Sequence, residues 1–325
     1  MIKFITLFLF LSLPKFSYSV AISTSSNLPN YVSLLPDIHG FDRFSDGGPD
    51  GNWYIGFNNA WIVKLPSAPI GNFTHAFIGA KIGRAKTQPN PDKPWQRDVI
   101  KGKIYMAVSQ VPAFSSEQSY FLTETSDISI DPDSPESKNP RGKGRWFWAE
   151  VPVGMISFNQ PNYLIIWSPT EYFTSVSSCP ILAAAMPENA SSSQEALAWN
   201  NHDISGVPPR SVEGALETPI NIFPALAIKL VGPGAQSAVT VQDFSVFKGT
   251  AHSVVRFSAS GKDIAGVWVE SSDDQLNWER MSPIHQSPPF YFSFDNSLLK
   301  SGNYLRGVAE DESGNIGFSM PAIIP

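Results

Sequence analysis

The chain has 325 residues and a formal net charge of −6, and only 16% of its residues are charged. This acidic balance argues against nonspecific binding to nucleic acid. The single cysteine, Cys179, excludes an intramolecular disulfide and a CxxC zinc site, and we expect it to be a small buried hydrophobic residue. The 28 prolines, 23 glycines and 12% aromatic residues favour an all-β protein over a helical bundle.

Residues 1–19 have the pattern of an export signal. Lys3 supplies the positive charge, an apolar run follows at 4–13, and the small residues Ser17 and Ser19 follow at the spacing of a cleavage site. The apolar run is too short to cross a bilayer, because about ten residues rise only about 15 Å as a helix. We therefore expect a secreted or cell-surface protein that does not span a membrane once 1–19 is removed. Residues 20–36 are polar and turn-rich, and we expect an extended lead-in there.

Residues 37–231 contain short runs of β-branched and aromatic residues separated by turn residues. The expected strands are 53–57, 60–65, 73–82, 100–109, 145–153, 163–168 and 225–231. Runs of this kind are typical of stacked antiparallel sheets, so we predict a jelly-roll-like β-sandwich. Long loops are expected at 83–99 and 124–144, and a capping box at 192–195 predicts one short helix that ends at 199.

A Gly/Pro-containing segment at 232–237 predicts a short linker to a second β-sandwich at 238–325. Side chains alternate along 252–259, and further strands are expected at 264–270, 288–295, 304–310 and 316–324. Asp311 and Asn315 flank a tight turn, where their side-chain oxygens can accept hydrogen bonds from free backbone N–H groups.

The second sandwich resembles the bacterial immunoglobulin-like domains that are appended to exported surface proteins and polysaccharide hydrolases. The matching segments are 257–260 (FSAS), 263–269 (DIAGVWV), 287–290 (SPPF), 295–298 (DNSL), 302–305 (GNYL) and 309–315 (AEDESGN). The resemblance implies a spacer, a presenter or a weak binder, and it implies no catalytic residue. Glu310 departs from the family pattern, which usually has a small or hydroxyl residue at this position. The change would be harmless if Glu310 faces solvent.

A loop at 46–52 (DGGPDGN) is a candidate Ca²⁺ site. Asp46, Asp50 and Asn52 supply oxygen ligands at close spacing, and Asp42 could add another. The loop lacks the spacing of an EF-hand. The alternative is an ordinary turn before the expected strand at 53–57. We therefore predict either no cofactor or Ca²⁺ at this loop.

Two groups of aromatic residues are candidate ligand-binding positions. Trp146 and Trp148 lie two apart in an expected strand, so they share one sheet face. They could stack on a sugar ring, or they could fill the interior of the sandwich. Trp95 lies in the polar, proline-bounded segment 91–97 and is the tryptophan most expected to be exposed. It is either an anchor for its loop or a ligand contact, with Lys93 and Arg97 beside it.

No GxSxG, HExxH, GxGxxG or P-loop motif occurs, which argues against the common hydrolases, metalloproteases and nucleotide-dependent enzymes. Our first hypothesis is a non-enzymatic exported protein that binds a polysaccharide or another cell-surface polymer. The alternatives are a structural protein of the cell envelope or surface assembly, and a glycosidase or lyase that acts on polysaccharide. An exposed aromatic side chain would favour the binder, a flat apolar patch would favour assembly, and a cleft with two carboxylates would favour the enzyme.

Overall fold

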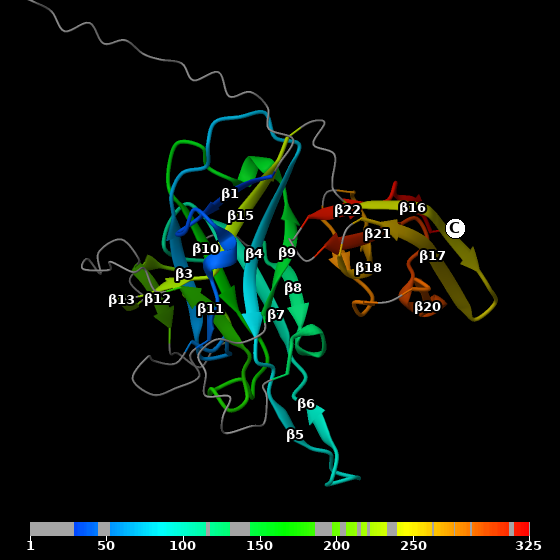
Figure 1. Cartoon of the computed structure of the whole chain (residues 1–325), viewed down its shortest axis with the longest axis horizontal. Helices are drawn as coiled ribbons and strands as arrows, with labels where there is room; N and C mark the ends of the chain where they lie inside the picture. Colours follow the sequence, from blue (N-terminus) through cyan, green and yellow to red (C-terminus); the bar gives the residue numbers. More distant parts are fainter. Residues whose placement is uncertain are drawn as a thin grey trace, which may run out of the picture.

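The computed structural model describes residues 29–44, 53–114, 118–130, 144–185, 197–201, 206–212, 216–219, 222–232, 239–261, 263–275, 277–286, 288–311 and 315–324. Within these ranges the protein is all-β and contains no α-helix. Short 3₁₀ turns occur at η1 (Ile38–Gly40), η2 (Thr125–Asp127), η4 (Val153–Met155) and η6 (Asn296–Leu298). Figure 1 shows the strands grouped in a larger N-terminal domain and a smaller C-terminal domain beside it.

The N-terminal domain is a sandwich of two antiparallel sheets, as the sequence predicts. The seven-stranded sheet contains β1 (Asn30–Ser33), β2 (Arg43–Phe44), β4 (His75–Gly83), β9 (Gly144–Val151), β11 (Ile181–Ala185), β14 (Phe223–Pro224) and β15 (Leu226–Val231). The six-stranded sheet contains β3 (Ala60–Leu65), β7 (Lys103–Ser109), β8 (Tyr120–Glu124), β10 (Asn162–Trp167), β12 (Leu197–Asn201) and β13 (Leu216–Pro219). Strands that are neighbours in sequence often belong to different sheets. Each sheet therefore forms only when segments that are distant in sequence pair.

Three expectations about local structure were wrong. Residues 53–57 form only an isolated bridge, Tyr54 to Ile181, and no strand. The end of the expected helix, at 197–199, belongs instead to β12, which pairs with both β3 and β13, and the rest of that segment lies outside the described residues. The expected loop 83–99 contains a hairpin of β5 (Thr87–Pro89) and β6 (Arg97–Val99). For β12 and for the β5–β6 hairpin, strand pairing decides the structure over local propensity.

The core of the N-terminal domain lies where alternating residues of its two sheets meet. In β4, Ile78 and Ala80 are fully buried, and Val63 of β3 and Met106 of β7 belong to the same cluster. Burial of each large aliphatic side chain stabilises the fold by about 1.5–3 kcal/mol. Cys179 is also fully buried, and burial raises the pKa of its thiol to about 11. The interpretation of Cys179 as a small buried hydrophobic residue is therefore correct.

The C-terminal domain is a second, smaller sandwich. Its three-stranded sheet contains β16 (Thr240–Lys248), β17 (His252–Ser260) and β20 (Tyr291–Asp295), and its five-stranded sheet contains β18 (Ile264–Ser272), β19 (Glu279–Arg280), β21 (Tyr304–Asp311), β22 (Ile316–Phe318) and β23 (Ala322–Ile323). In β17, Val255 and Phe257 point into the core, while Val254 and Arg256 point outward.

The turn between β21 and β22 has the expected side-chain hydrogen bonds. The backbone N–H of Asn315 donates to Oδ1 of Asp311 at 2.8 Å, and Nδ2 of Asn315 donates to Oδ2 of Asp311 at 2.8 Å. The backbone N–H of Asp311 donates to the Asn315 carbonyl at 3.0 Å. The prediction is confirmed for Asp311, whose side-chain oxygen accepts from a backbone N–H, whereas the Asn315 side chain acts as a donor to Asp311.

Candidate functional site

The two domains meet through a buried interface. The five-stranded sheet of the C-terminal domain places Val267, Val269 and Leu305 in its own core. Its opposite face places Trp268 and Val308 in the core cluster of the N-terminal domain. In Figure 1 this sheet lies beside β8 and β9, which are edge strands of the two N-terminal sheets. The C-terminal domain therefore covers the open edge of the first sandwich.

Arg306 of β21 is the central cation of the interface. Its Nη2 lies 2.6 Å from Oε2 of Glu150 in the N-terminal domain and 2.7 Å from Oε2 of Glu270 in its own domain. The guanidinium also lies between two rings, with Cζ 4.1 Å from the ring centroids of both Trp278 and Phe318. Only 7% of the Arg306 side chain is exposed, so ion pairing and stacking act together in a desolvated place.

Glu150 is held from both domains. Oε1 lies 2.7 Å from Nδ1 of His75, and Oε2 lies close to Arg306 as described. Burial has the largest single effect and raises the pKa of Glu150. The hydrogen bond from His75 and the charge of Arg306 together outweigh burial, so the pKa lies below its ordinary value. Glu150 is therefore a carboxylate in the folded protein at neutral pH.

Glu310 is the residue that departs from the immunoglobulin-like pattern, and the structure explains why it is there. Its side chain is only 4% exposed, and its Oε2 lies 3.4 Å from Nη2 of Arg145 in the N-terminal domain. Glu310 does not face solvent, so the condition under which the change would be harmless is not met. Burial raises the pKa of Glu310 to about 7, against the opposing charges of Arg145 and Lys229.

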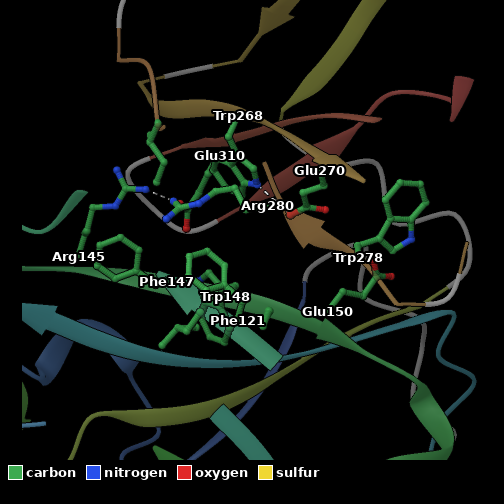
Figure 2. Close-up of a pocket in the computed structure, with 13 residues that line it drawn as sticks. Phe121, Arg145, Phe147, Trp148, Glu150, Trp268, Glu270, Trp278, Arg280 and Glu310 are labelled. Carbon is green, nitrogen blue, oxygen red and sulfur yellow. Dashed lines mark hydrogen bonds and ion pairs between the residues drawn. The ribbon is translucent and has the colours of Figure 1, made fainter. Parts of the chain in front are cut away.

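Figure 2 shows a small pocket at this interface, lined by side chains of both domains. Its volume is about 20 Å³, which is enough for one water molecule. Arg145, Phe147 and Trp148 approach it from β9, and Trp268 and Glu310 approach it from the C-terminal domain. A pocket of this size between paired charges is part of the interface and leaves no room for an organic ligand.

Lys229 of β15 is buried beside the interface. Its Nζ lies 6.0, 5.8 and 5.5 Å from the ring centroids of Tyr31, Phe77 and Trp148. Burial lowers the pKa of Lys229 to about 8, while the charges of Glu310 and Asp311 act in the opposite direction. This environment could not be predicted from the sequence, because the three rings around Lys229 come from distant strands.

Trp146 and Trp148 are buried, with 8% and 7% exposed surface. Their rings stack on each other at 5.2 Å, and the indole Nε1 of Trp146 donates to the Ile38 carbonyl at 3.3 Å. Gly79 of β4 pairs with Trp148, and a Cβ at Gly79 would collide with the indole. Both tryptophans therefore pack inside the protein, and neither presents its ring to a ligand at the surface.

Trp95 lies at the tip of the β5–β6 hairpin and is 82% exposed. The tip is held by Asn90, whose Oδ1 accepts hydrogen bonds from the backbone N–H groups of Asp92 at 2.8 Å and Lys93 at 2.9 Å. The hairpin projects away from both domains in Figure 1. The expectation of exposure is confirmed, and the alternative that Trp95 anchors its loop is wrong, because so exposed an indole packs against almost nothing.

The two basic residues beside Trp95 differ in what they contact. Lys93 is exposed at the tip. Arg97 donates from Nε to Oγ1 of Thr87 and from Nη2 to the Thr87 carbonyl, both at 2.8 Å. Arg97 therefore ties the two strands of the hairpin together, and its guanidinium already serves a structural purpose.

The candidate Ca²⁺ loop falls mostly outside the described residues. Asp46, Asp50 and Asn52 are not among them, and only Asp42, which is half-buried before β2, is described. Within the described residues no group of three or more His, Cys, Asp or Glu side chains could hold a metal ion. The calcium site stays a prediction.

The sequence matches no protein-family model and no curated protein. Among solved structures, a β-glucuronidase from Ruminococcus gnavus is 10% identical at a TM-score of 0.23, with 87% of this chain and 39% of that chain covered. A β-D-glucuronidase from Dictyoglomus thermophilum is 12% identical at a TM-score of 0.24, with 92% of this chain and 44% of that chain covered. The glycoside hydrolase domain of Endo-D from Streptococcus pneumoniae is 14% identical at a TM-score of 0.22, with 81% of this chain and 30% of that chain covered.

The chain thus spans less than half the length of each of these three proteins. Similarity at such TM-scores carries no argument about fold or activity. Within the described part of the chain, no helix is long and apolar enough to cross a membrane.

Proposed function

We propose that the chain is an exported, non-enzymatic binding protein for a carbohydrate or another cell-surface polymer, and that Trp95 is its leading contact. The observation that carries the proposal is the 82% exposure of an indole on a hydrogen-bonded hairpin. Large apolar side chains at such a tip contribute little to folding, so a partner accounts for the residue better than stability does. Sugar rings present apolar C–H faces that stack on indoles, and Lys93 can donate to their hydroxyl groups.

Export in this proposal rests on the signal-like sequence at 1–19, which lies outside the described residues. The C-terminal domain would act as the immunoglobulin-like presenter that its resemblance implies. The buried pair of Arg306 and Glu150 gives that presenter a fixed orientation, so the hairpin would be held at a set angle to the C-terminal domain.

A second candidate function, assembly into a surface structure, is favoured by a separate observation. Phe247, Val254 and Tyr291 are 53%, 37% and 57% exposed on the outward face of the β16–β17–β20 sheet. Their exposed parts together offer on the order of 300 Å², which is well below the ~800 Å² per partner of a standard interface. This patch therefore supports assembly less strongly than Trp95 supports binding.

The test is capture of the purified full chain on a panel of insoluble polysaccharides, with Trp95→Ala compared with wild type. Ile70→Ala is the matched control, since Ile70 is 83% exposed in a loop far from the hairpin in sequence. Trp146→Ala reports what loss of a buried tryptophan does to the melting temperature and to binding. We expect Trp95→Ala to lose capture at an unchanged melting temperature, and Ile70→Ala to behave as wild type. If wild type is captured by no polysaccharide, assembly becomes the first hypothesis.

A further inference from the structure

A polar groove lies between the two domains, apart from the β5–β6 hairpin and next to the small pocket of Figure 2, with which it shares Phe121 and Trp278. Its volume is about 550 Å³, which is within the usual ~300–1,000 Å³ of small-molecule sites. One wall comes from β7, β8 and the residues just before β8 in the N-terminal domain. The other wall comes from 271–273, 277–279, Lys300 and Asn303 in the C-terminal domain.

The two walls are held together by buried charges. Nη2 of Arg280 lies 2.5 Å from Oδ2 of Asp127, and the two side chains are 7% and 5% exposed. The Arg280 guanidinium also lies over the ring of Phe121, 5.2 Å from its centroid. A groove with walls fixed in this way is formed before a ligand arrives, which lowers the entropic cost of binding.

Neutral hydrogen-bonding groups make up most of the lining. Side-chain hydroxyls come from Tyr105, Ser119 and Ser271, and side-chain amides come from Gln118, Asn277 and Asn303. Hydroxyl groups both donate and accept hydrogen bonds, and amides have both kinds of atom. A ligand with many hydroxyl groups finds both donors and acceptors along this lining.

Aromatic rings supply the apolar part of the same groove. Tyr105 and Phe121 meet edge to face, with ring centroids 5.7 Å apart and an interplanar angle of 73°. Trp278 lines the groove from the C-terminal domain and is half-buried. Rings beside neutral hydrogen-bonding groups suit a saccharide, whose C–H faces stack while its hydroxyls bond.

The charges in the lining select among hydroxyl-rich ligands. Asp273 and Glu279 are acidic, and Lys300 is the basic residue in the lining. The excess of negative charge disfavours phosphorylated or uronate-bearing ligands. We propose that this groove binds a short neutral saccharide, so that the chain has a second carbohydrate contact formed jointly by both domains. This inference rests on the proposed function, that the chain binds carbohydrate.

The test is isothermal titration of the full chain with cellohexaose, xylohexaose, mannohexaose and chitohexaose, and with trigalacturonic acid as an anionic comparison. Ser119→Trp fills the groove from an exposed position, and Asn303→Ala removes one lining amide. Ser67→Trp makes the same substitution at an exposed serine outside the groove. The melting temperature of each variant shows whether it has kept its fold.

We expect at least one neutral oligosaccharide to bind, with affinity at least tenfold weaker in Ser119→Trp and reduced in Asn303→Ala. Ser67→Trp and Trp95→Ala should bind it as wild type does. The inference is overturned if no neutral oligosaccharide binds, if trigalacturonic acid binds in preference, or if Ser119→Trp leaves the affinity unchanged. Loss of polysaccharide capture in Trp95→Ala with unchanged oligosaccharide affinity would support both contacts. Unchanged capture in Trp95→Ala would remove the hairpin, and unchanged oligosaccharide affinity in Ser119→Trp would remove the groove.

Discussion

Nη2 of Arg306 in the C-terminal domain lies 2.6 Å from Oε2 of Glu150 in the N-terminal domain, and the guanidinium lies between the rings of Trp278 and Phe318. This contact fixes the orientation of the two sandwich domains relative to each other. The Trp95 hairpin and the interdomain groove therefore have fixed relative positions.

Arg306→Ala should destabilise the protein by about 3–5 kcal/mol, because it leaves the buried carboxylates of Glu150 and Glu270 without their cation. Urea unfolding measures the loss. Arg256→Ala is the control, since Arg256 is an exposed arginine that lies over Phe247 on the outer sheet. A loss for Arg306→Ala no larger than that of the control would contradict a stabilising role for this contact.

Glu310→Gln should become more stable relative to wild type as the pH rises. The folded-state pKa of Glu310 is raised to about 7, so between pH ~4.5 and ~7 the folded protein holds a proton that the unfolded chain has lost. Wild type therefore loses stability across this window, and the neutral glutamine does not. The difference in unfolding free energy between the two proteins should grow by on the order of 3 kcal/mol from pH 4.5 to 8. A difference that does not change with pH would show that Glu310 is ionised throughout.

His75→Ala should make the protein more sensitive to acid. The pKa of Glu150 is depressed partly by its hydrogen bond to His75, and a depressed carboxyl pKa stabilises the fold above the unfolded value. This stability is lost as the pH falls through the folded-state pKa. Loss of His75 raises that pKa, so acid unfolding followed by circular dichroism should begin at a higher pH. His39→Ala, at an exposed histidine, should unfold at the wild-type pH; equal midpoints for both variants would exclude the proposed effect of His75.

Calcium should raise the melting temperature if the loop at 46–52 binds it, because a ligand that binds only the folded state stabilises that state. A chelator should remove the increase, and Asp50→Ala should be insensitive to both. Asp92→Ala is the control, at an exposed aspartate in the hairpin. Equal melting temperatures with chelator and with millimolar calcium would contradict calcium binding and support the alternative that the loop is an ordinary turn.

The strands that are predicted correctly are those whose own residues show a strand pattern. Side chains alternate along 252–259, and Val255 and Phe257 do face the core. The strand β11 was missed because its run of Ile-Leu-Ala-Ala-Ala does not alternate between apolar and polar residues and contains only one β-branched residue, Ile181. It is buried along its whole length. The residues of β12 follow a capping box, and only their pairing with β3 and β13 makes them a strand.

The candidate site, like the strands, could be predicted from the sequence only in part. Exposure of Trp95 could be predicted, because prolines and charges around it exclude a buried strand. The interdomain contact could not, because Glu150 and Arg306 are 156 residues apart and neither has a distinctive local motif. The only sequence feature that pointed to the interdomain contact was Glu310, an acidic residue where the domains that this segment resembles usually have a small or hydroxyl residue. Such a departure is compatible with a buried ion pair and equally with a solvent-facing position.

The most direct test of the account is the affinity of wild type and Trp95→Ala for the polysaccharide that captures wild type, measured by depletion binding at equal melting temperatures. Truncation of an aromatic anchor at the centre of a contact costs about 2 kcal/mol or more, so we predict an affinity at least ~30-fold weaker for Trp95→Ala. Ile70→Ala should keep the wild-type affinity. Equal affinities for wild type and Trp95→Ala would contradict the claim that the exposed hairpin is the binding element.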